Sequence, residues 1–264
     1  MPNTAMLAPL SLPSLEALLR AQVFGHPLAH RPDVDSTQEW GRTEARNGAP
    51  EGAVFLTDYQ TSGRGRLGRT WLAPPCSSVL ASLLVRPGAS LYPRLFMIGG
   101  LAAVMAIEAD CGVPCSIKWP NDVLIKGMKV AGVLTEGGFV GAVPDFSLVG
   151  IGINVNLDPA TLAPTRYPAT SLSHEVGTAV DRERLIADLL LWFERLYAEP
   201  AESDAIPNLW RARLDILGRP VTIVSNGEAV EGTATNVDST GALTLTLPSR
   251  ERRTFVAGDV SLSP

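Results

Sequence analysis

The chain has 264 residues, of which 45% are hydrophobic and 19% are charged, and its net charge is −5. This composition supports a sizeable core and argues against intrinsic disorder, and the acidic balance argues against a broad basic surface for duplex nucleic acid. The sequence contains neither a membrane-spanning apolar run nor a recognisable signal peptide, so we expect a cytoplasmic protein that does not bind membranes.

Apolar patterning in the first 110 residues predicts helices and strands in alternation. Helices are expected where apolar residues recur at helical spacing, and strands where short apolar runs are bounded by turn residues. The predicted helices cover residues 11–22, a segment opening at DSTQEW, and 93–110, and the predicted strands cover 52–60 and 77–85. The segment 93–110 is apolar nearly all round and should be a core helix, whereas the residues between the first two helices read as a connector.

DSTQEW carries the signals of a helix start. Ser36 or Thr37 can serve as the N-cap, and Ser36 together with Glu39 fits a capping box.

In the remainder of the chain, the pattern predicts three extended segments and one amphipathic helix, and the residue pattern changes near Leu217. The extended segments are 116–125, 129–138 and 146–156, with a tight turn at Gly127, and the helix is 181–199. From Gly218 onward, short runs of Val, Thr and Leu alternate with turn residues, which is typical of a small barrel of antiparallel strands. We therefore expect three regions, a leader with a short helix, a main domain and a small C-terminal domain, with bounds 1–30, 31–216 and 217–264.

The sequence GRGRLGR places Gly63, Gly65 and Gly68 in the order G-x-G-x-x-G, the fingerprint of a dinucleotide-binding turn. That turn requires a helix directly after the glycines and an acidic residue about 20 residues further on. Two prolines follow TWLA, where they prevent a helix, and no acid stands at the expected distance. We instead interpret the segment as a pliable loop whose three arginines can hold an anion.

Three further motifs carry polar residues within extended segments. They are KWPNDV with Asn121 and Asp122, KVAGVL with Lys129, and GIGINVN with Asn154. Each alone has a simpler interpretation: an ordinary turn, a solvated lysine, or an amide paired within the core. The three cysteines, Cys76, Cys111 and Cys115, form no disulfide framework and no recognisable zinc site.

Taken in order, these motifs resemble those of the biotin protein ligase family. The blocks DSTQ, DYQTSGRGRLGRTW, KWPNDVLI, KVAGVLTE, GIGINVN and ATSL span residues 33–172. The resemblance implies an α+β catalytic domain, like that of class II aminoacyl-tRNA synthetases, with a mixed, mostly antiparallel sheet flanked by helices. It also implies a small C-terminal SH3-like β-barrel.

The resemblance further implies a two-step reaction. Biotin and ATP would give biotinyl-5′-AMP and pyrophosphate, and a lysine of the biotin carboxyl carrier protein of acetyl-CoA carboxylase would then displace AMP. Mg²⁺ is implied by the ATP chemistry, but the sequence does not identify its ligands. A homodimer is possible, since family members pair through sheet edges or remain monomeric.

Residue roles carry over from the family by position. Ser36, Thr37, Gln60, Gly63 and Arg64 match contacts to the ureido ring of biotin. Trp71, Asn121 and Asn154 match groups that bind the adenine end of the adenylate. Arg66 and Arg69 match loop residues that enclose the adenylate, with Arg66 at the phosphate. Lys129 matches the lysine at the junction of the carboxylate and the phosphate, and with Arg66 it is the expected electrostatic catalyst. Gln38 departs from the family, since many members have asparagine there.

Three alternatives remain open at this stage. A lipoate-type ligase shares the fold and the class of chemistry. A biotin-sensing DNA-binding repressor is disfavoured, because only about thirty residues precede DVDST and no DNA binding is expected. A nicotinamide-dependent oxidoreductase is disfavoured by the prolines after the glycine–arginine loop.

Overall fold

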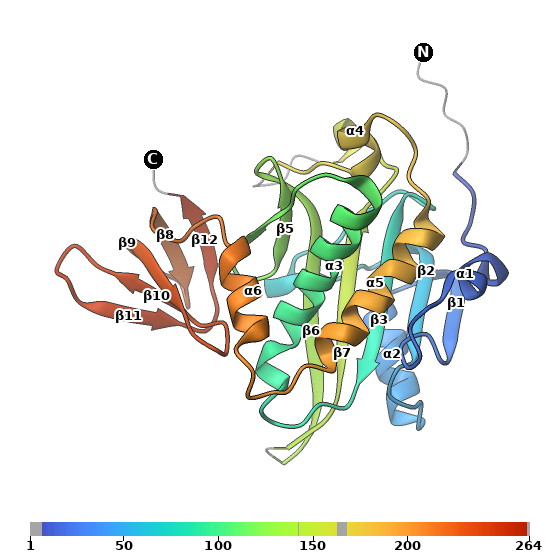
Figure 1. Ribbon diagram of the computed structural model, residues 1–264, viewed down its shortest axis with the longest axis horizontal. Coiled ribbons are helices and arrows are strands. Elements are labelled where there is room, and N and C mark those ends of the chain that lie inside the picture. Colours follow the sequence, from blue (N-terminus) through green and yellow to red (C-terminus); the bar gives the residue numbers. More distant parts are fainter. Residues whose placement is uncertain (1–6, 142, 163–167, 263–264) are drawn as a thin grey trace.

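The computed structural model describes residues 7–141, 143–162 and 168–262. They form a seven-stranded sheet with helices packed against it and, to one side, a smaller five-stranded sheet (Figure 1). The expected α+β architecture is confirmed.

The large sheet is mixed and mostly antiparallel. Its strand order is β1-β2-β3-β7-β6-β5-β4, and β1 and β2 pair in parallel whereas all other neighbours are antiparallel. The strands are β1 (Leu28–Val34), β2 (Val54–Gln60), β3 (Ser78–Val85), β4 (Ser116–Lys118), β5 (Asp122–Ile125), β6 (Met128–Val140) and β7 (Val143–Asn154). The connector expected between the first two helices is wrong in part, because β1 lies there as an edge strand. The alternation of apolar and polar residues that marks a strand is not visible in β1, because Pro32 interrupts it and its side chains are partly exposed.

Helices cover both faces of this sheet. They are α1 (Leu12–Leu18), α2 (Thr37–Arg46), α3 (Leu95–Cys111), α4 (Leu172–Val176), α5 (Arg182–Tyr197) and α6 (Ala205–Arg213). Gly99 of α3 packs on Val149, whereas Gly41 of α2 packs on Leu148. Because successive residues of a strand point to opposite faces, α2 and α3 lie on opposite sides of β7. The buried α3 expected from its apolar sequence is confirmed.

Two helix predictions need correction. The first predicted helix, 11–22, is shorter in the structure and ends at Leu18. The capping box at α2 does not form, since the Ser36 hydroxyl accepts a hydrogen bond from the Gln38 amide and the Glu39 carboxylate pairs with Arg42 and Arg64 instead. The Glu39 carboxylate therefore forms ion pairs with two arginines in place of the local capping hydrogen bond. The tight turn at Gly127 is confirmed, with positive φ at Lys126 and Gly127.

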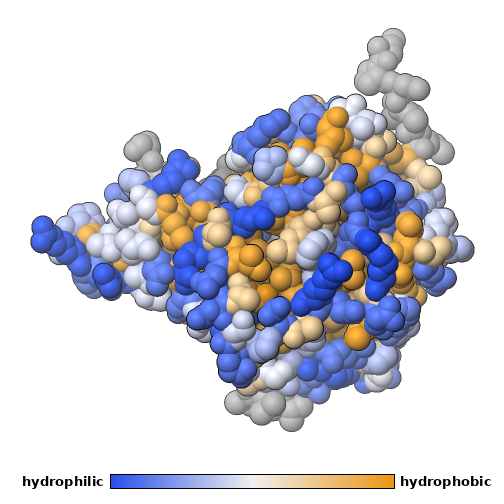
Figure 2. Space-filling view, viewed as in Figure 1, coloured by the Kyte–Doolittle hydropathy of each residue, from blue (hydrophilic) through white to orange (hydrophobic). Residues whose placement is uncertain are grey.

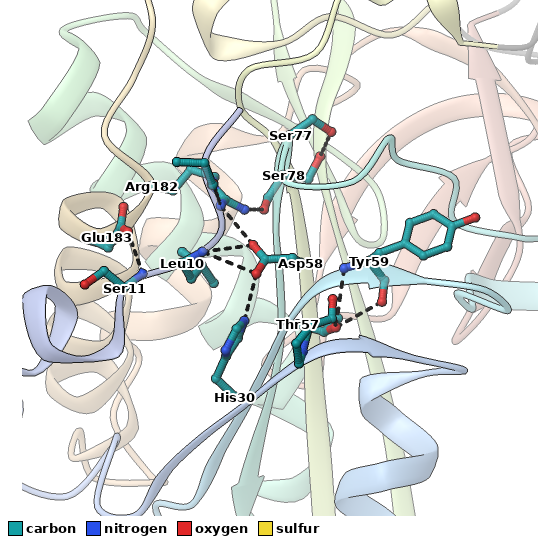
Figure 3. Close-up of polar contacts among 12 residues, drawn as sticks. Leu10, Ser11, His30, Thr57, Asp58, Tyr59, Ser77, Ser78, Arg182 and Glu183 are labelled. Atoms are coloured by element: carbon teal, nitrogen blue, oxygen red, sulfur yellow. Dashed lines mark hydrogen bonds and ion pairs between the residues drawn. The ribbon is translucent and has the colours of Figure 1, made fainter. Parts of the chain in front are cut away.

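A buried ionic network fixes the N-terminal segment to the body of the domain (Figure 3). The Asp58 carboxylate on β2 accepts hydrogen bonds from the Leu10 backbone N–H at 3.1 and 3.2 Å and from Arg182 Nη2 at 2.9 Å. His30 Nε2 lies 2.9 Å from Asp58 Oδ2. Arg182 also donates to the Ala8 carbonyl at 2.7 Å. Since Asp58 and Arg182 are both buried, each depends on the other for compensation of its charge.

The C-terminal sheet is antiparallel throughout, as expected for a small all-β domain. Its order is β11-β10-β9-β8-β12, with strands β8 (Pro220–Ser225), β9 (Glu228–Val237), β10 (Leu243–Thr246), β11 (Arg252–Phe255) and β12 (Asp259–Leu262). Trp119 connects it to the large sheet, since its indole N–H donates to the Gly241 carbonyl at 2.8 Å. The domain bounds at residues 30 and 216 remain predictions.

The surface over α3, α5 and α6 mixes hydrophobic patches with hydrophilic residues (Figure 2). Among the described residues, no helix is both long enough and apolar enough to cross a bilayer.

Candidate active site

A cavity of about 240 Å³ lies against β3, β6 and β7 of the large sheet. Its walls come from the start of α2, the glycine–arginine loop (residues 61–72), the turn between β4 and β5, and β12 of the C-terminal sheet. The cavity brings together Ser36, Thr37, Gln60, Arg64, Arg66, Arg69, Trp71, Asn121, Lys129 and Asn154. All but one of the residues that the sequence singled out therefore converge.

Gly63 is the exception, because it does not line the cavity. A Cβ there would come within 2.5 Å of the Trp71 carbonyl oxygen and 2.9 Å of the Gln60 side-chain nitrogen. The Trp71 N–H donates to the Gly63 carbonyl at 2.9 Å. Glycine at this position lets the two limbs of the loop meet, so the structure gives it a packing role beside Gln60.

One end of the cavity is an uncharged polar wall at the N-terminus of α2. The Thr37 N–H donates to Gln60 Oε1 at 2.8 Å, and Ser82 Oγ donates to Thr37 Oγ1 at 2.8 Å. Ser36 and Thr37 are buried. Because hydroxyl and amide side chains of Ser36, Thr37 and Gln60 line this end, it suits a neutral ligand with both donors and acceptors.

Gln38 extends the same wall to β6. Its Nε2 donates to the Leu134 carbonyl at 2.9 Å, and a side chain at Gly150 would clash with this amide. Its Oε1 is buried and has no hydrogen-bond partner among the described residues. The Gln38 side chain is thus long enough to reach from α2 to β6.

The glycine–arginine loop folds back on itself and does not lead into a helix. The Gly65 N–H donates to the Arg69 carbonyl at 2.7 Å, and residues Arg66–Gly68 form a single 3₁₀ turn. Leu67 adopts a left-handed conformation with φ 56° and its side chain is exposed. No helix follows before β3, so the dinucleotide-binding interpretation is excluded in favour of a cationic loop.

Each cation of the cavity wall that the sequence predicted contacts an acidic or amide side chain. Arg66 Nη1 donates to Asn121 Oδ1 at 3.0 Å, Lys129 Nζ lies 2.6 Å from Asp122 Oδ1, Arg64 Nη1 lies 2.5 Å from Glu39 Oε1, and Arg69 pairs with Asp259. The predicted basic loop is therefore not a solvated turn. It forms a cluster of partnered cations around the cavity, in which cations outnumber carboxylates.

Burial changes the proton affinity of two cations of the cavity wall, Arg66 and Lys118. Burial lowers the pKa of the Arg66 guanidinium, although the charges of Asp122 and Asp259 oppose the shift. Burial also lowers the pKa of Lys118 to about 8, again against the effect of Asp122 and Asp259, and the neighbouring Lys129 adds to the lowering. Desolvation disfavours the charged form, so an anion in the cavity would raise these pKa values again.

Trp71 forms part of the cavity floor. Its indole lies against β6 and β7, where a Cβ at Gly152 would come within 2.6 Å of the ring and one at Gly132 within 3.1 Å. Lys129 Nζ is 5.3 Å from the ring centre. The glycines of VAGV and GIGI therefore make room for the indole, and Trp71 places an aromatic face beside the cationic cluster.

The two predicted asparagines are held by backbone groups. Asn121 Nδ2 donates to the Val133 carbonyl at 2.8 Å, which leaves its oxygen for Arg66. Asn154 Nδ2 donates to the Thr170 carbonyl at 3.0 Å, so its amide has a partner within the protein. Thr170 also pairs through its N–H with the Lys129 carbonyl, which connects the ATSL block to the site.

Three charged residues of the wall, Lys118, Asp122 and Asp259, were not among the predicted site residues, although Asp122 was noted as a polar residue of its motif. Lys118 and Asp122 stand within the KWPNDV motif, so their position was a signal for them. Asp259 lies in the C-terminal sheet, and no motif connects it to the loop. Among the described residues, no three His, Cys, Asp or Glu side chains cluster to hold a metal ion.

Comparisons with known proteins agree with this geometry. Residues 33–154 match the Biotin/lipoate A/B protein ligase family, and residues 216–263 match the Biotin protein ligase C terminal domain. The Bifunctional ligase/repressor BirA of Bacillus subtilis is 35% identical over 232 residues, which cover 86% of this chain and 71% of that protein. The Biotin--[acetyl-CoA-carboxylase] ligase of Mycobacterium tuberculosis is 33% identical over 264 residues, which cover 93% and 94% respectively.

A solved structure supports the same assignment. The biotin protein ligase from Aquifex aeolicus in complex with biotin and ATP has a TM-score of 0.76 and 27% identity, covering 89% of this chain and 99% of that chain. Relatives of more than 30% identity thus extend along most of the sequence, through both sheets, and this chain belongs to the biotin protein ligase family.

Proposed function

We propose that this protein is a biotin–[acetyl-CoA-carboxylase] ligase that activates biotin with ATP and transfers it to a lysine of a carrier protein. The observation that carries this proposal is the division of one cavity into a neutral polar end and a cationic end. Biotin has the same division, with a neutral ureido ring at one end and a carboxylate at the other. Curated relatives of this identity are named for this activity.

In the first step, a carboxylate oxygen of biotin attacks the α-phosphorus of ATP and pyrophosphate leaves. Both reactants are anions, so their approach needs positive charge fixed in advance. We assign this task to Lys129 and Arg66, whose charged groups lie in the cavity wall beside Asp122 and Asn121. Arg69 encloses the phosphates from the loop, and positioning supplies most of the remaining rate.

The neutral end would hold the ureido ring through Ser36, Thr37 and Gln60, with Arg64 closing the loop over it. Trp71 would pack on the adenine, with Asn121 and Asn154 on the same side. In the second step, the amine of the carrier lysine attacks the acyl carbon, AMP leaves and the amine loses a proton.

Magnesium would enter as part of MgATP. The cavity offers the carboxylates of Asp122 and Asp259, which already contact Lys129 and Arg69. Since Mg²⁺ in such sites is held mainly by the phosphates and by water, we assign neither carboxylate to the ion.

The direct test combines the purified protein with biotin, MgATP and a carrier domain, followed by a streptavidin blot. We expect biotinylation that requires ATP and the target lysine of the carrier. The exchange of labelled pyrophosphate into ATP should increase when biotin is added. Exchange supported by lipoate instead would favour a lipoate-type ligase and contradict the proposal.

The affinity for ATP should depend on pH through Lys118. Because its pKa is lowered to about 8 and an anion favours its charged form, binding should weaken as the pH rises from 7 to 9, by roughly tenfold. The KM for ATP in pyrophosphate exchange measures this effect. In Lys118→Met this dependence should disappear, whereas Lys126→Met, at an exposed lysine, should retain it. A wild-type pH dependence in Lys118→Met would exclude the assignment.

The arginine loop should retain the activated intermediate. Arg66→Gly removes a guanidinium that contacts Asn121, and loss of one charged hydrogen bond should speed release of biotinyl-AMP by roughly tenfold to a hundredfold. Dissociation of labelled adenylate measures this release. Arg250→Gly is the matched control, since Arg250 is exposed and has a φ of 70° that glycine accepts. Unchanged dissociation in Arg66→Gly would rule out the enclosing role.

A further inference from the structure

Asp259 brings a negative charge from the C-terminal sheet into the active-site cavity. It stands at the start of β12 and lines the cavity together with Val260. Its carboxylate pairs with Arg69 of the glycine–arginine loop, 190 residues earlier in the chain. The Asp259 side chain is 18% exposed and that of Arg69 is 48% exposed, so the arginine can change partners more easily than the carboxylate can move into water.

The influence of Asp259 extends beyond this pair. Burial lowers the pKa of both Arg66 and Lys118, and the charge of Asp259 opposes this lowering after that of Asp122, which places Asp259 within electrostatic reach of each. A single carboxylate thus acts on three cations of one cavity, and these are the cations to which the proposed function assigns the phosphates of ATP.

This position creates a conflict once a polyphosphate enters. The phosphates need the positive charges that Asp259 neutralises, and they are repelled by Asp259 itself. Asp122 and Lys129 have a similar pairing, but both belong to the hairpin of β5 and β6. The pair of Asp259 and Arg69 differs, because it joins the glycine–arginine loop to the C-terminal sheet.

Resting on the proposed function, we propose that Asp259 is an exchangeable counter-ion for the polyphosphate. In the empty enzyme it holds Arg69; when ATP binds, the guanidinium transfers to the phosphates; when pyrophosphate leaves, Asp259 recaptures it. Asp259 is therefore a positioning residue that acts through Arg69. It lowers the affinity for pyrophosphate, speeds its release and couples the C-terminal sheet to the first step.

The exchange predicts an unusual direction of effect. Asp259→Asn removes the competitor while retaining size and shape, so pyrophosphate should bind about tenfold more tightly and the KM for ATP should fall. The Kd for biotin should not change. Asp259→Glu, which restores the charge, should return pyrophosphate affinity toward the wild-type value. A residue that merely supports the loop would give the opposite result, namely weaker binding of ATP and pyrophosphate in Asp259→Asn.

The experiment is calorimetric titration of the full chain with pyrophosphate, alongside pyrophosphate-exchange kinetics. Glu228→Gln is the matched control, since it neutralises an exposed carboxylate that pairs with Arg253 in the same sheet. Thermal unfolding verifies that each variant is folded. In an Arg69→Gln background, the gain from Asp259→Asn should shrink, because the exchange partner is absent.

Two results would overturn the inference. One is unchanged or weaker pyrophosphate binding in Asp259→Asn while the variant remains folded. The other is an equal gain with and without Arg69. Failure of the proposed function is distinguishable, because it would appear as wild-type protein that biotinylates no carrier, whereas pyrophosphate titration needs neither biotin nor carrier.

Discussion

Lys129→Ala is expected to slow adenylate formation by roughly 10²–10³-fold, the usual effect of removing one preorganised donor from the site of developing charge. Lys129 Nζ lies in the cavity wall, 2.6 Å from Asp122 and beside the ring of Trp71. With the ammonium removed, the carboxylate of biotin and the α-phosphate meet without its compensation, and Asp122 adds repulsion. Pyrophosphate exchange at saturating biotin and ATP measures the effect.

The fold should survive this substitution. The backbone of Lys129 retains its bonds to Pro168 and Thr170, and only the side chain is lost. Lys126→Asn provides a matched control, because Lys126 is an exposed lysine of the same hairpin and asparagine tolerates its φ of 50°. The double variant Lys129→Ala with Asp122→Asn separates lost attraction from added repulsion. Normal exchange in Lys129→Ala would refute the catalytic role.

The sequence predicted the cavity better than it predicted the charge pairing inside the cavity. Motif residues such as Asn121, Lys129 and Asn154 stand on or directly beside strands of one sheet, so their order along the chain carries the information. Asp259 could not be found in this way. Its pairing with Arg69 depends on how the C-terminal sheet docks, which local pattern does not encode.

The fold shows the same division between local and tertiary information. The buried helix α3 and the turn at Gly127 follow from local sequence and were predicted. Strand β1 was missed because its pairing with β2 is parallel and its side chains are partly exposed, so neither a hairpin turn nor a clean alternation marks it. The Glu39 capping box was wrong because Arg42 and Arg64, one of them distant in sequence, engage its carboxylate.

Asp58→Ala is expected to lower the free energy of unfolding by about 3–5 kcal/mol, the usual cost of removing one partner from a buried ion pair. The substitution leaves Arg182 buried without its carboxylate and removes the acceptor of the Leu10 N–H. It also removes the partner of His30. Urea unfolding at neutral pH measures the change. Asp145→Ala is the control, since Asp145 pairs with Arg86 at the surface and exposed pairs contribute about 0–1 kcal/mol.

A second variant identifies the cause of the loss. If the cost comes from the stranded guanidinium, Asp58→Ala combined with Arg182→Met should recover part of the stability, because an apolar replacement of a buried pair is often neutral. Equal instability of the single and double variants would instead point to the Leu10 and His30 contacts. Asp58 lies on β2 just before Gln60 but does not line the cavity, so the KM for biotin should stay unchanged wherever the variant is folded. A destabilisation below 1 kcal/mol in Asp58→Ala would show that the network does not hold the N-terminal segment in place.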